Sequence, residues 1–377
     1  MIIFISQYKF PEGDAGSERT LYLAQAYKLL GYEVLIVAYG NKAKSGIHKS
    51  INYISLRYVR NKYISRLLWY IRLNIVLKDT IKNCSIDAFV AGNLDFISSK
   101  LLKLWCLNTK HKLIYDAVEW YDPRQFKKGN RSFIYIENNT LITKTIDKSS
   151  SVIAISSYLN NYFKSRNIHT VNIPIIFNQN EYPYIKKTAS NTLRLQYAGS
   201  PYKKDSLDVI LLGLNLLNDE ELTRIHFDII GVDEIQLLNL VGDINVLNRI
   251  KPCLSVLGRK SMKYVRNNMK LVDFNILVRN NDFRNVKAGF PTKVIEGISL
   301  STPFIMNFTS DLALYFKDGI NCIEVKYFSP EAMKKSLRYA LSLSQDDKDR
   351  ISRSAKETAM ENFNIDTYSD RLQDILY

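Results

Sequence analysis

The sequence lacks several features that identify particular classes of protein. It has four cysteines in 377 residues, and because they are scattered no metal-type cysteine pair is present and reduced thiols are expected (Cys84, Cys106, Cys253 and Cys322). No run of eighteen apolar residues occurs, which argues against a membrane-spanning helix. The N-terminal "MIIFISQYKF" lacks a preceding basic region and a small-residue cleavage site, so we interpret it as a buried strand and not a signal peptide.

Acidic residues are also outnumbered. Lys and Arg total 52 against 37 Asp and Glu, which gives a net charge of +15. Such a charge favours anionic partners, namely nucleic acid, an anionic membrane surface or phosphorylated small molecules. Because no RNA- or DNA-binding module signature appears, nucleic acid is the weaker expectation.

The hydrophobic pattern predicts an α/β fold with two domains, since the chain is too long for one ordinary core. Strand-like runs alternate with helical segments, which indicates parallel sheets covered on both faces. The predicted strands of the first half are "MIIFIS", "YEVLIVAY", "IDAFVAG", "KLIYDAV" and "SSVIAIS". Those of the second half are "LRLQYAG", "IHFDIIG", "SVLGR", "FNILVR" and "PFIMNF", with helices near 205–215, 262–269 and 292–300.

A polar stretch at 177–192 is the candidate linker between the domains. We therefore expect two Rossmann-like, doubly wound domains at 1–185 and 192–357 that face each other across a cleft. The amphipathic helical segment 358–377 is expected to pack back on the first domain. Ligands of such sheets bind beyond the carboxyl ends of the strands, so the loops that follow the strands are the candidate sites.

The loops after the first strand of each half contain small residues. "PEGDAGSERT" places Gly16 at a turn and Ser17 as a helix N-cap, although it does not match the dinucleotide fingerprint G-x-G-x-x-G. An ordinary strand-to-helix turn is the alternative. "YAGSPYKKDSLD" places Gly199, Ser200, Lys203 and Lys204 at the corresponding position, where a Lys would neutralise a departing diphosphate. A solvated Lys pair is the alternative there.

The stretch "KAGFPTKVIEGISLSTPF" puts an acid, Glu296, on a short apolar segment. Three residues, Phe290, Pro291 and Thr292, turn the chain into a helix, so the amides near Thr292 and Lys293 form an anion site. A Glu one turn further in is suited to accept hydrogen bonds from the vicinal hydroxyls of a ribose. The alternative is a solvated helix face, but buried acids are rare unless paired.

Further charged residues follow other strands. Arg279 and Arg284 in "ILVRNNDFRNV" are suited to a phosphate or a sugar carboxylate, or else to surface salt bridges. The segment "IYDAVEWYDP" brings Asp116 and Glu119 beside aromatic rings, which suits sugar binding, and one acid is suited to act as a base on an acceptor hydroxyl. A capping and turn cluster that also includes Asp122 is the alternative.

The segment 56–78, "LRYVRNKYISRLLWYIRLNIVLK", has six basic residues and no acid. As a helix it is expected to have one apolar face, with Arg66, Trp69 and Tyr70 away from it. That apolar face comprises Ile64, Leu67, Leu68, Ile71 and Ile75. This pattern is typical of a helix at an anionic membrane interface. A core helix with a basic outer face is the alternative.

Taken together, these motifs resemble the family 4 retaining glycosyltransferases of the GT-B fold, over nearly the whole chain. The resemblance is carried by "GDAGSERT", "SSVIAISSYLNNYF", "YAGSPYKKD", "FDIIG", "VLGRKSMKYVRNNM" and "AGFPTKVIEGISLSTPF". The last is similar to the second half of the family's Glu-x7-Glu motif, in which the second acid, here Glu296, holds the ribose hydroxyls. Lys204 lies at the position of the family's phosphate-binding Lys.

Two positions depart from the family. The first acid of the motif is replaced by Ala288, and Ser200 stands near the place of the Arg that usually precedes the phosphate Lys. Lys203, Arg279 or Arg284 is expected to supply the missing positive charge.

The resemblance implies transfer of a sugar from a UDP-linked donor to a hydroxyl of a glycan or polyprenyl-linked acceptor, with retention and without a metal or other cofactor. It assigns the first domain to the acceptor and the second to the nucleotide sugar. With the basic charge it implies capsule or O-antigen synthesis in the cytoplasm, at the inner face of the plasma membrane. A GT-B UDP-sugar 2-epimerase and a non-enzymatic nucleic-acid-binding protein are the alternatives.

Overall fold

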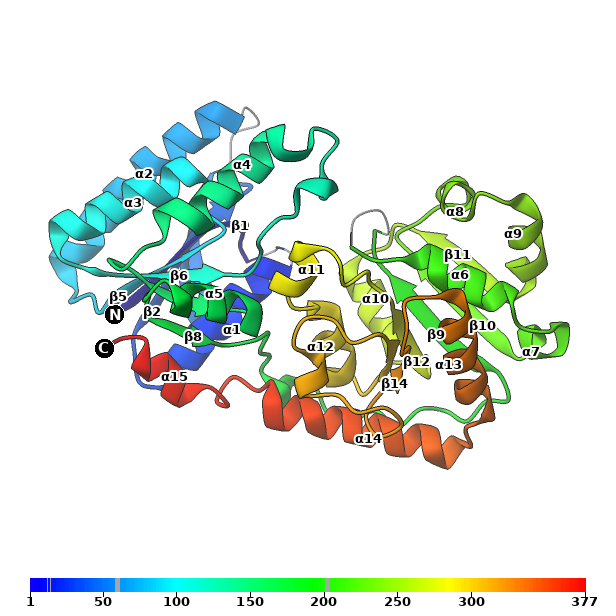
Figure 1. The fold of residues 1–377 in the computed structure, drawn as a ribbon. Helices are drawn as coiled ribbons and strands as arrows, with labels where there is room; N and C mark the ends of the chain where they lie inside the picture. The colour runs from blue at the N-terminus through cyan, green and yellow to red at the C-terminus, as the bar shows by residue number, and fades with distance from the viewer. Residues whose placement is uncertain (12, 14, 58–61, 201–203) are drawn as a thin grey trace. The chain divides into compact units, whose positions relative to one another are not determined.

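The computed structural model describes residues 1–11, 13, 15–57, 62–200 and 204–377 (Figure 1). The chain divides into two compact units, which are described separately. Unit 1 comprises Met1–Asn178, Ala288–Phe290 and Ile365–Tyr377, and unit 2 comprises Gln179–Lys287 and Pro291–Asn364. The first division thus falls at residue 178, ahead of most of the predicted linker.

Unit 1 is built on an eight-stranded sheet in the order β3-β4-β2-β1-β5-β6-β7-β8. Its strands are β1 Ile2–Lys9, β2 Val34–Gly40, β3 Lys44–His48, β4 Ile51–Arg57, β5 Ala88–Gly92, β6 Lys112–Ala117, β7 Ser151–Ala154 and β8 Thr170–Asn172. The sheet is parallel except for β3, which pairs antiparallel with β4. Its helices are α1 Ala15–Leu29, α2 Lys62–Asn83, α3 Phe96–Thr109, α4 Phe133–Thr140, α5 Ser157–Ser165 and α15 Ser369–Asp374.

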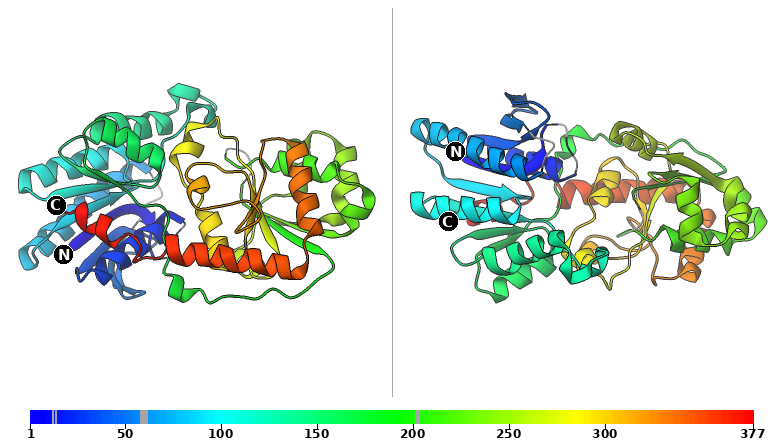
Figure 2. Two further views of the ribbon diagram at one scale, coloured as in Figure 1. Left: turned by 60° about the horizontal axis from the view of Figure 1, so that its bottom comes forward. Right: turned by 90° about the horizontal axis from the view of Figure 1, so that it is seen from above.

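Most residues of the predicted apolar runs of unit 1 lie in its strands and are buried. All five residues of β5 are buried, as expected for a parallel strand with helices on both faces (Figure 2). The C-terminal helix α15 packs beside α1 and β8, and Arg371 Nη1 donates to Asn172 O at 2.6 Å.

Unit 2 is built on a six-stranded, all-parallel sheet in the order β11-β10-β9-β12-β13-β14. Its strands are β9 Leu193–Ala198, β10 Ile225–Ile230, β11 Leu254–Gly258, β12 Phe274–Leu277, β13 Phe304–Met306 and β14 Ile323–Glu324. Its helices are α6 Leu207–Asn215, α7 Asp219–Thr223, α8 Glu234–Val241, α9 Ile244–Ile250, α10 Met262–Met269, α12 Thr292–Ser299, α13 Pro330–Ser342 and α14 Gln345–Asn362, and α11 Arg284–Ala288 leads from it into unit 1.

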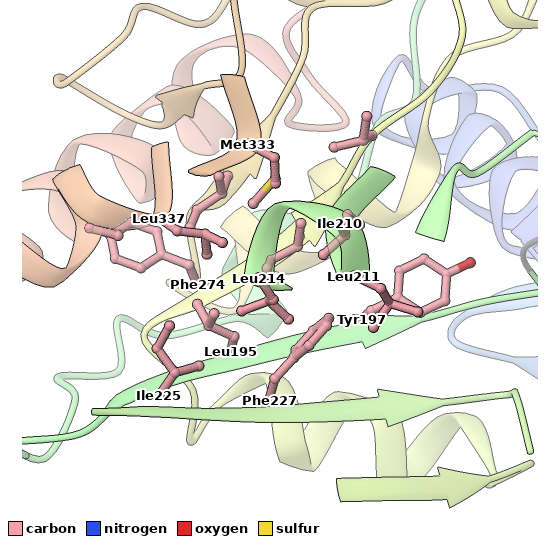
Figure 3. Close-up of a cluster of buried hydrophobic side chains, with 14 of the residues drawn as sticks. Leu195, Tyr197, Ile210, Leu211, Leu214, Ile225, Phe227, Phe274, Met333 and Leu337 are labelled. Carbon is pink, nitrogen blue, oxygen red and sulfur yellow. The ribbon is translucent and has the colours of Figure 1, made fainter. Parts of the chain in front are cut away.

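The core of unit 2 lies between its sheet and the helices α6 and α13 (Figure 3). Leu195 and Phe227 project from adjacent strands toward Leu214 of α6, and Met333 and Leu337 of α13 close the cluster. This cluster fixes the sheet whose carboxyl edge carries the candidate site.

The predicted fold class is confirmed: the protein is α/β, with two Rossmann-like units. One hairpin, β3–β4, was not predicted. Its two-residue turn, Lys49 and Ser50, has φ of 44° and 66°, a geometry usually signalled by Asn or Gly.

Two helix predictions were wrong in detail. α1 begins at Ala15, so Ser17 lies inside the first turn, 2% exposed, and is not the N-cap. The segment predicted as a helix from residue 56 begins as strand β4, and its helix, α2, starts at Lys62.

α2 packs on its unit through a different face from the one that the core-helix alternative expects. Trp69, Leu73 and Leu77 are buried against the unit, whereas Ile71 and Ile75 are 47% and 65% exposed. The expected contact of the Ile71 and Ile75 face with an anionic membrane surface stays a prediction. Among the described residues, no helix is both long and apolar enough to cross a membrane.

Candidate functional site

Unit 2 has a candidate ligand-binding edge at the carboxyl ends of β9 and β12. β10 and β11 lie on one side of β9 and β12, β13 and β14 on the other, so the order of the strands reverses at β9. Such a reversal leaves a crevice outside the strand ends, where ligands of open parallel sheets bind. The loop after β9 starts at Gly199, and the segment after β12 carries Arg279.

A buried carboxylate, Asp205, joins the two predicted cations of this edge. Its Oδ2 lies 2.6 Å from Lys293 Nζ, and its Oδ1 accepts a hydrogen bond from Arg279 Nε at 2.8 Å. The Tyr197 hydroxyl also donates to Oδ2, at 3.3 Å. The Asp205 side chain is only 5% exposed, while Lys293 keeps 24% of its side chain exposed. Two cations on one anion leave an excess of positive charge at the edge of the sheet.

Electrostatics keep this cluster ionised. Burial alone would raise the pKa of the Asp205 carboxyl, but Lys293 and Arg279 outweigh that effect and hold the pKa below its ordinary value. Burial raises the pKa of the Tyr197 phenol, and Asp205 raises it further, so the phenol stays a neutral donor. The position of Arg279 is fixed as well, because Asn307 accepts from its backbone N–H at 2.9 Å and donates to its carbonyl at 2.7 Å.

Gly199 is required by the space around this cluster. A Cβ at residue 199 would lie 2.7 Å from Lys293 Nζ, 2.9 Å from Tyr197 Oη and 3.0 Å from Asp205 Oδ2. Lys293 Nζ also donates to Ala198 O at 2.9 Å, so it is held against the end of β9. A side chain at 199 would therefore displace the ammonium group from the strand end.

Glu296 is buried on α12, with only 5% of the residue exposed. The solvated-helix-face alternative is therefore wrong. Its Oε1 accepts a hydrogen bond from Arg266 Nε, on α10, at 2.5 Å. An ionised carboxylate is an acceptor with about four lone-pair sites, so it is a suitable partner for ligand hydroxyls as well as for a guanidinium.

The two helices that carry this pair are capped by buried lysines. Lys187 Nζ donates to the carbonyls of Met269 and Lys270 at 3.1 Å each, at the C-terminus of α10. Lys356 Nζ donates to Ser299 O at 3.2 Å, at the C-terminus of α12. Burial lowers the pKa of Lys187 to about 7 and that of Lys356 to about 8. These caps position α10 and α12 and so align Arg266 with Glu296.

The other predicted residues of unit 2 lie near this edge or outside the described part. Lys204 is half-buried and directly precedes Asp205, whereas Ser200 is exposed. Lys203 lies outside the described residues. Arg284 is half-buried at the start of α11. Their ligand roles stay predictions.

The turn into α12 is divided between the units. Phe290 is buried and belongs to unit 1, as does Ala288, whose carbonyl accepts a hydrogen bond from Ser156 Oγ at 2.7 Å. Pro291 is the N-cap and Thr292 the first residue of α12. The first amides of an α-helix have no intrahelical partner, so the predicted anion site at Thr292 and Lys293 agrees with the observed helix start.

In unit 1, Asp116 is part of a buried ion pair. Arg19 Nε donates to both carboxylate oxygens at 3.0 Å, and its Nη2 donates to Oδ1 at 2.8 Å. The same guanidinium donates to Pro174 O and Ile173 O, at 2.6 and 3.0 Å. This geometry favours a structural role for Asp116 over the predicted catalytic one. Asp122 is likewise the N-cap of a short 3₁₀ helix, as the capping alternative proposes.

Gly16 also has a packing role. A Cβ at residue 16 would lie 2.1 Å from the nearest ring carbon of Tyr8, so only glycine lets this ring pack on the first turn of α1. The predicted close approach at Gly16 is thus made by a protein side chain.

Glu119 lines a cavity of about 380 Å³ at the carboxyl ends of β1, β5 and β6. The same cavity is lined by Tyr121 and by Glu137 of α4. Burial raises the pKa of the Tyr121 phenol, and the charge of Glu119 and a hydrogen bond to it raise it further, so the phenol stays neutral. No group of three or more metal-ligating side chains occurs among residues 1–11, 13, 15–57, 62–200 and 204–377.

Sequence reasoning missed two residues of the site, Asp205 and Arg266. Asp205 follows two lysines at the predicted start of a helix, where an acid is ordinarily solvated. Arg266 lies on a basic amphipathic helix. Neither has a local signal, because both obtain their role from side chains more than 25 residues away in sequence.

Several solved structures share the fold. A sucrose-phosphate synthase from Thermosynechococcus elongatus has a TM-score of 0.74 and 13% identity, covering 99% of this chain and 97% of that one. Anabaena HepE, solved with UDP and glucose, has a TM-score of 0.68 and 12% identity, covering 100% and 99%. WaaG, a glycosyltransferase of lipopolysaccharide biosynthesis, has a TM-score of 0.67 and 14% identity, covering 99% of both chains.

No protein-family model and no curated protein sequence matches the chain. At 12–14% identity, the structural likeness establishes the architecture alone: the chain has the GT-B fold, built from two Rossmann-like units.

Proposed function

We propose that the protein is a retaining glycosyltransferase of family 4 that moves a sugar from a UDP-linked donor to a hydroxyl of a glycan or lipid-linked acceptor. One observation carries the proposal: the carboxyl edge of the unit 2 sheet combines the Asp205 cluster, with its excess positive charge, and a buried carboxylate, Glu296, held by Arg266. A diphosphate needs the first feature and a ribose the second. The glycosyltransferases among the structural neighbours, and the UDP in HepE, support the same assignment.

In this proposal Glu296 accepts hydrogen bonds from the ribose hydroxyls, and Arg266 orients its carboxylate. The first amides of α12, with Lys293, face the diphosphate. Lys204 neutralises the charge that develops on the leaving diphosphate, without a metal ion or other cofactor.

The two departures from the family pattern have a physical counterpart. Ser200 takes the place of a cation, and Arg279 is held nearby at the same sheet edge by Asp205 and Asn307. We assign to Arg279 the positive charge that the family's Arg supplies. Ala288 cannot contact the donor sugar as a Glu would, so donor recognition is assigned to other groups.

The acceptor is assigned to surface-polysaccharide synthesis, such as capsule or O-antigen, on the inner face of the plasma membrane. Exposed Ile71 and Ile75 on α2, in a chain of net charge +15, support contact with anionic lipid. Flotation with vesicles containing anionic lipid, at low salt, tests this contact. Protein that stays with the soluble fraction would argue against it.

The enzyme assignment is tested by a nucleotide thermal-shift screen followed by turnover. UDP should raise the melting temperature more than GDP, CMP or ADP, since a ligand stabilises in proportion to its affinity. Lys204→Ala should then slow the release of UDP from a UDP-sugar about 10²–10³-fold, because roughly 3–4 kcal/mol of transition-state stabilisation is lost. Turnover near the wild-type rate would refute this role of Lys204, and interconversion of UDP-sugars without acceptor would favour an epimerase.

A further inference from the structure

Three helices of unit 1 form one layer on its sheet. α2, α3 and α4 belong to crossovers that step in the same direction along the sheet, from β4 to β5, to β6 and to β7. Because such crossovers are right-handed, the three helices cover one face, whereas α1 belongs to a step in the opposite direction and covers the other (Figure 1 and Figure 2). We call these helices, with the segment 126–132 that leads into α4, the α2–α4 layer.

The outer surface of this layer carries apolar side chains on all three helices. Besides the exposed isoleucine pair of α2, five side chains of α3 and α4 are between 46% and 55% exposed, namely Ile97, Leu104, Leu107, Phe133 and Ile136. On each helix they are three or seven positions apart and therefore line one helix face. Exposed apolar side chains that gather on one surface mark an interaction site, whereas single ones need no explanation.

The exposed charges of the same layer are mostly positive. Among its described side chains, one exposed acid, Asp79, stands against five exposed cations, those of Lys78, Lys100, Lys127, Lys128 and Arg131. The stretch 123–136, "PRQFKKGNRSFIYI", has four basic residues and no acid. The layer thus combines apolar side chains with a positive charge.

This combination fits an anionic lipid bilayer. Apolar side chains of such a surface enter the boundary between headgroups and acyl chains, while Lys and Arg contact the lipid phosphates. A nucleic acid would use the cations but would leave the apolar side chains in water. A second copy of the same surface would bring like charges together, which opposes pairing.

We propose that the α2–α4 layer docks the protein on an anionic bilayer, with exposed side chains of α3 and α4 inserted at the interface and the cations on lipid phosphates. The inference rests on the proposed function for its lipid-linked acceptor, and it extends the contact inferred for α2 to a surface of three helices.

Vesicle flotation of the full-length protein measures the docking. Vesicles of an equimolar mixture of phosphatidylglycerol and phosphatidylcholine are compared with vesicles of phosphatidylcholine alone. The partition coefficient should be at least about tenfold higher on the anionic vesicles, and it should fall as salt rises because the charges are screened.

Apolar substitutions locate the inserted surface. Leu104→Gln/Phe133→Gln, with one change on α3 and one on α4, should lower the partition coefficient about tenfold, because two half-exposed apolar side chains no longer enter the interface. Ile235→Gln/Ile244→Gln is the matched control in unit 2, where these side chains are 74% and 51% exposed. The control should partition as the wild type does.

Charge substitutions test the contact with lipid phosphates. Lys127→Gln/Lys128→Gln should lower the partition coefficient about tenfold at low salt and much less at high salt. Lys326→Gln/Lys335→Gln removes two exposed cations of unit 2 and should change neither value. Melting temperatures verify that all variants fold.

Three results would overturn the proposal. They are equal partition on the two kinds of vesicle, partition of the layer variants equal to that of the wild type, and a dimer in light scattering that Leu104→Gln/Phe133→Gln dissociates. The last result would show that a second copy covers the layer.

Calorimetry with UDP separates this inference from the proposed function, because the candidate nucleotide site belongs to unit 2. If UDP binds and anionic vesicles do not, the docking inference fails alone. If anionic vesicles bind and UDP does not, the proposed function fails and the docking surface stands.

Discussion

The Asp205 cluster predicts an asymmetric response to mutation. Asp205→Asn removes the shared anion and leaves Lys293 and Arg279, with side chains 24% and 12% exposed, facing an amide instead of a carboxylate. Breaking a buried pair by removing one partner costs about 3–5 kcal/mol, because a buried charge is left without its counterion. Lys293→Met leaves Asp205 paired with Arg279, so it should cost only about 1–2 kcal/mol.

Thermal unfolding of unit 2 measures this difference. For a domain of 150–250 residues, 1 kcal/mol shifts the melting temperature by about 2–4 °C, so Asp205→Asn should lower it by roughly 6–20 °C and Lys293→Met by roughly 2–8 °C. Far-UV circular dichroism follows both units. Tryptophan fluorescence follows unit 1 alone, because all three tryptophans, at 69, 105 and 120, belong to it.

Asp219→Asn is the matched control in the same unit. Asp219 pairs with Arg249 at 3.0 Å, but its side chain is 91% exposed, so its loss should change stability by less than about 1 kcal/mol. Equal losses for Asp205→Asn and Lys293→Met, or a loss at Asp205 no larger than at Asp219, would refute the shared-anion account.

Two further predictions concern the same unit. Gly199→Ala places a Cβ 2.7 Å from Lys293 Nζ, so it should destabilise the protein by about 1–3 kcal/mol and weaken UDP binding. Calorimetry at a temperature well below unfolding measures the affinity for UDP. Unchanged affinity would count against the role of Lys293. The folded-state pKa of Lys187, about 7, lies below the ordinary lysine value of 10.5, so between these pH values the unfolded chain binds more protons and stability should rise with pH. Lys187→Met should flatten that rise in melting temperature between pH 7 and pH 9, and an unaltered pH dependence would contradict the assignment.

The predicted elements that matched the structure have strong local signals. The strands of both sheets are short apolar runs bounded by turn residues, and buried parallel strands differ little from that pattern. Because strand ends are read from the same pattern, the segments that follow the strands at Gly199 and Arg279 were also located correctly. Positions along the chain were therefore predictable where a single segment determines them.

The features that were missed depend on contacts between distant segments. The packed face of α2 could not be predicted, because two sets of apolar residues share the helical period and only packing decides that Trp69 is buried and Ile75 exposed. Asp116 reads as a candidate base until Arg19, 97 residues away, is seen to hold it. The role of a charged residue can therefore be assigned only when its partner in the fold is known.

Titration of UDP into the wild-type protein, Glu296→Ala and Glu296→Gln by isothermal calorimetry tests the central claim most directly. The account predicts binding to the wild type and a loss of about 1.5–3 kcal/mol, roughly 10–100-fold, for Glu296→Ala, because hydrogen bonds to a charged carboxylate are lost. Glu331→Ala, an exposed acid in the first turn of α13, should bind UDP as the wild type does. Two results would contradict the nucleotide site: no binding of UDP to the wild type, or an affinity of Glu296→Ala for UDP equal to that of the wild type.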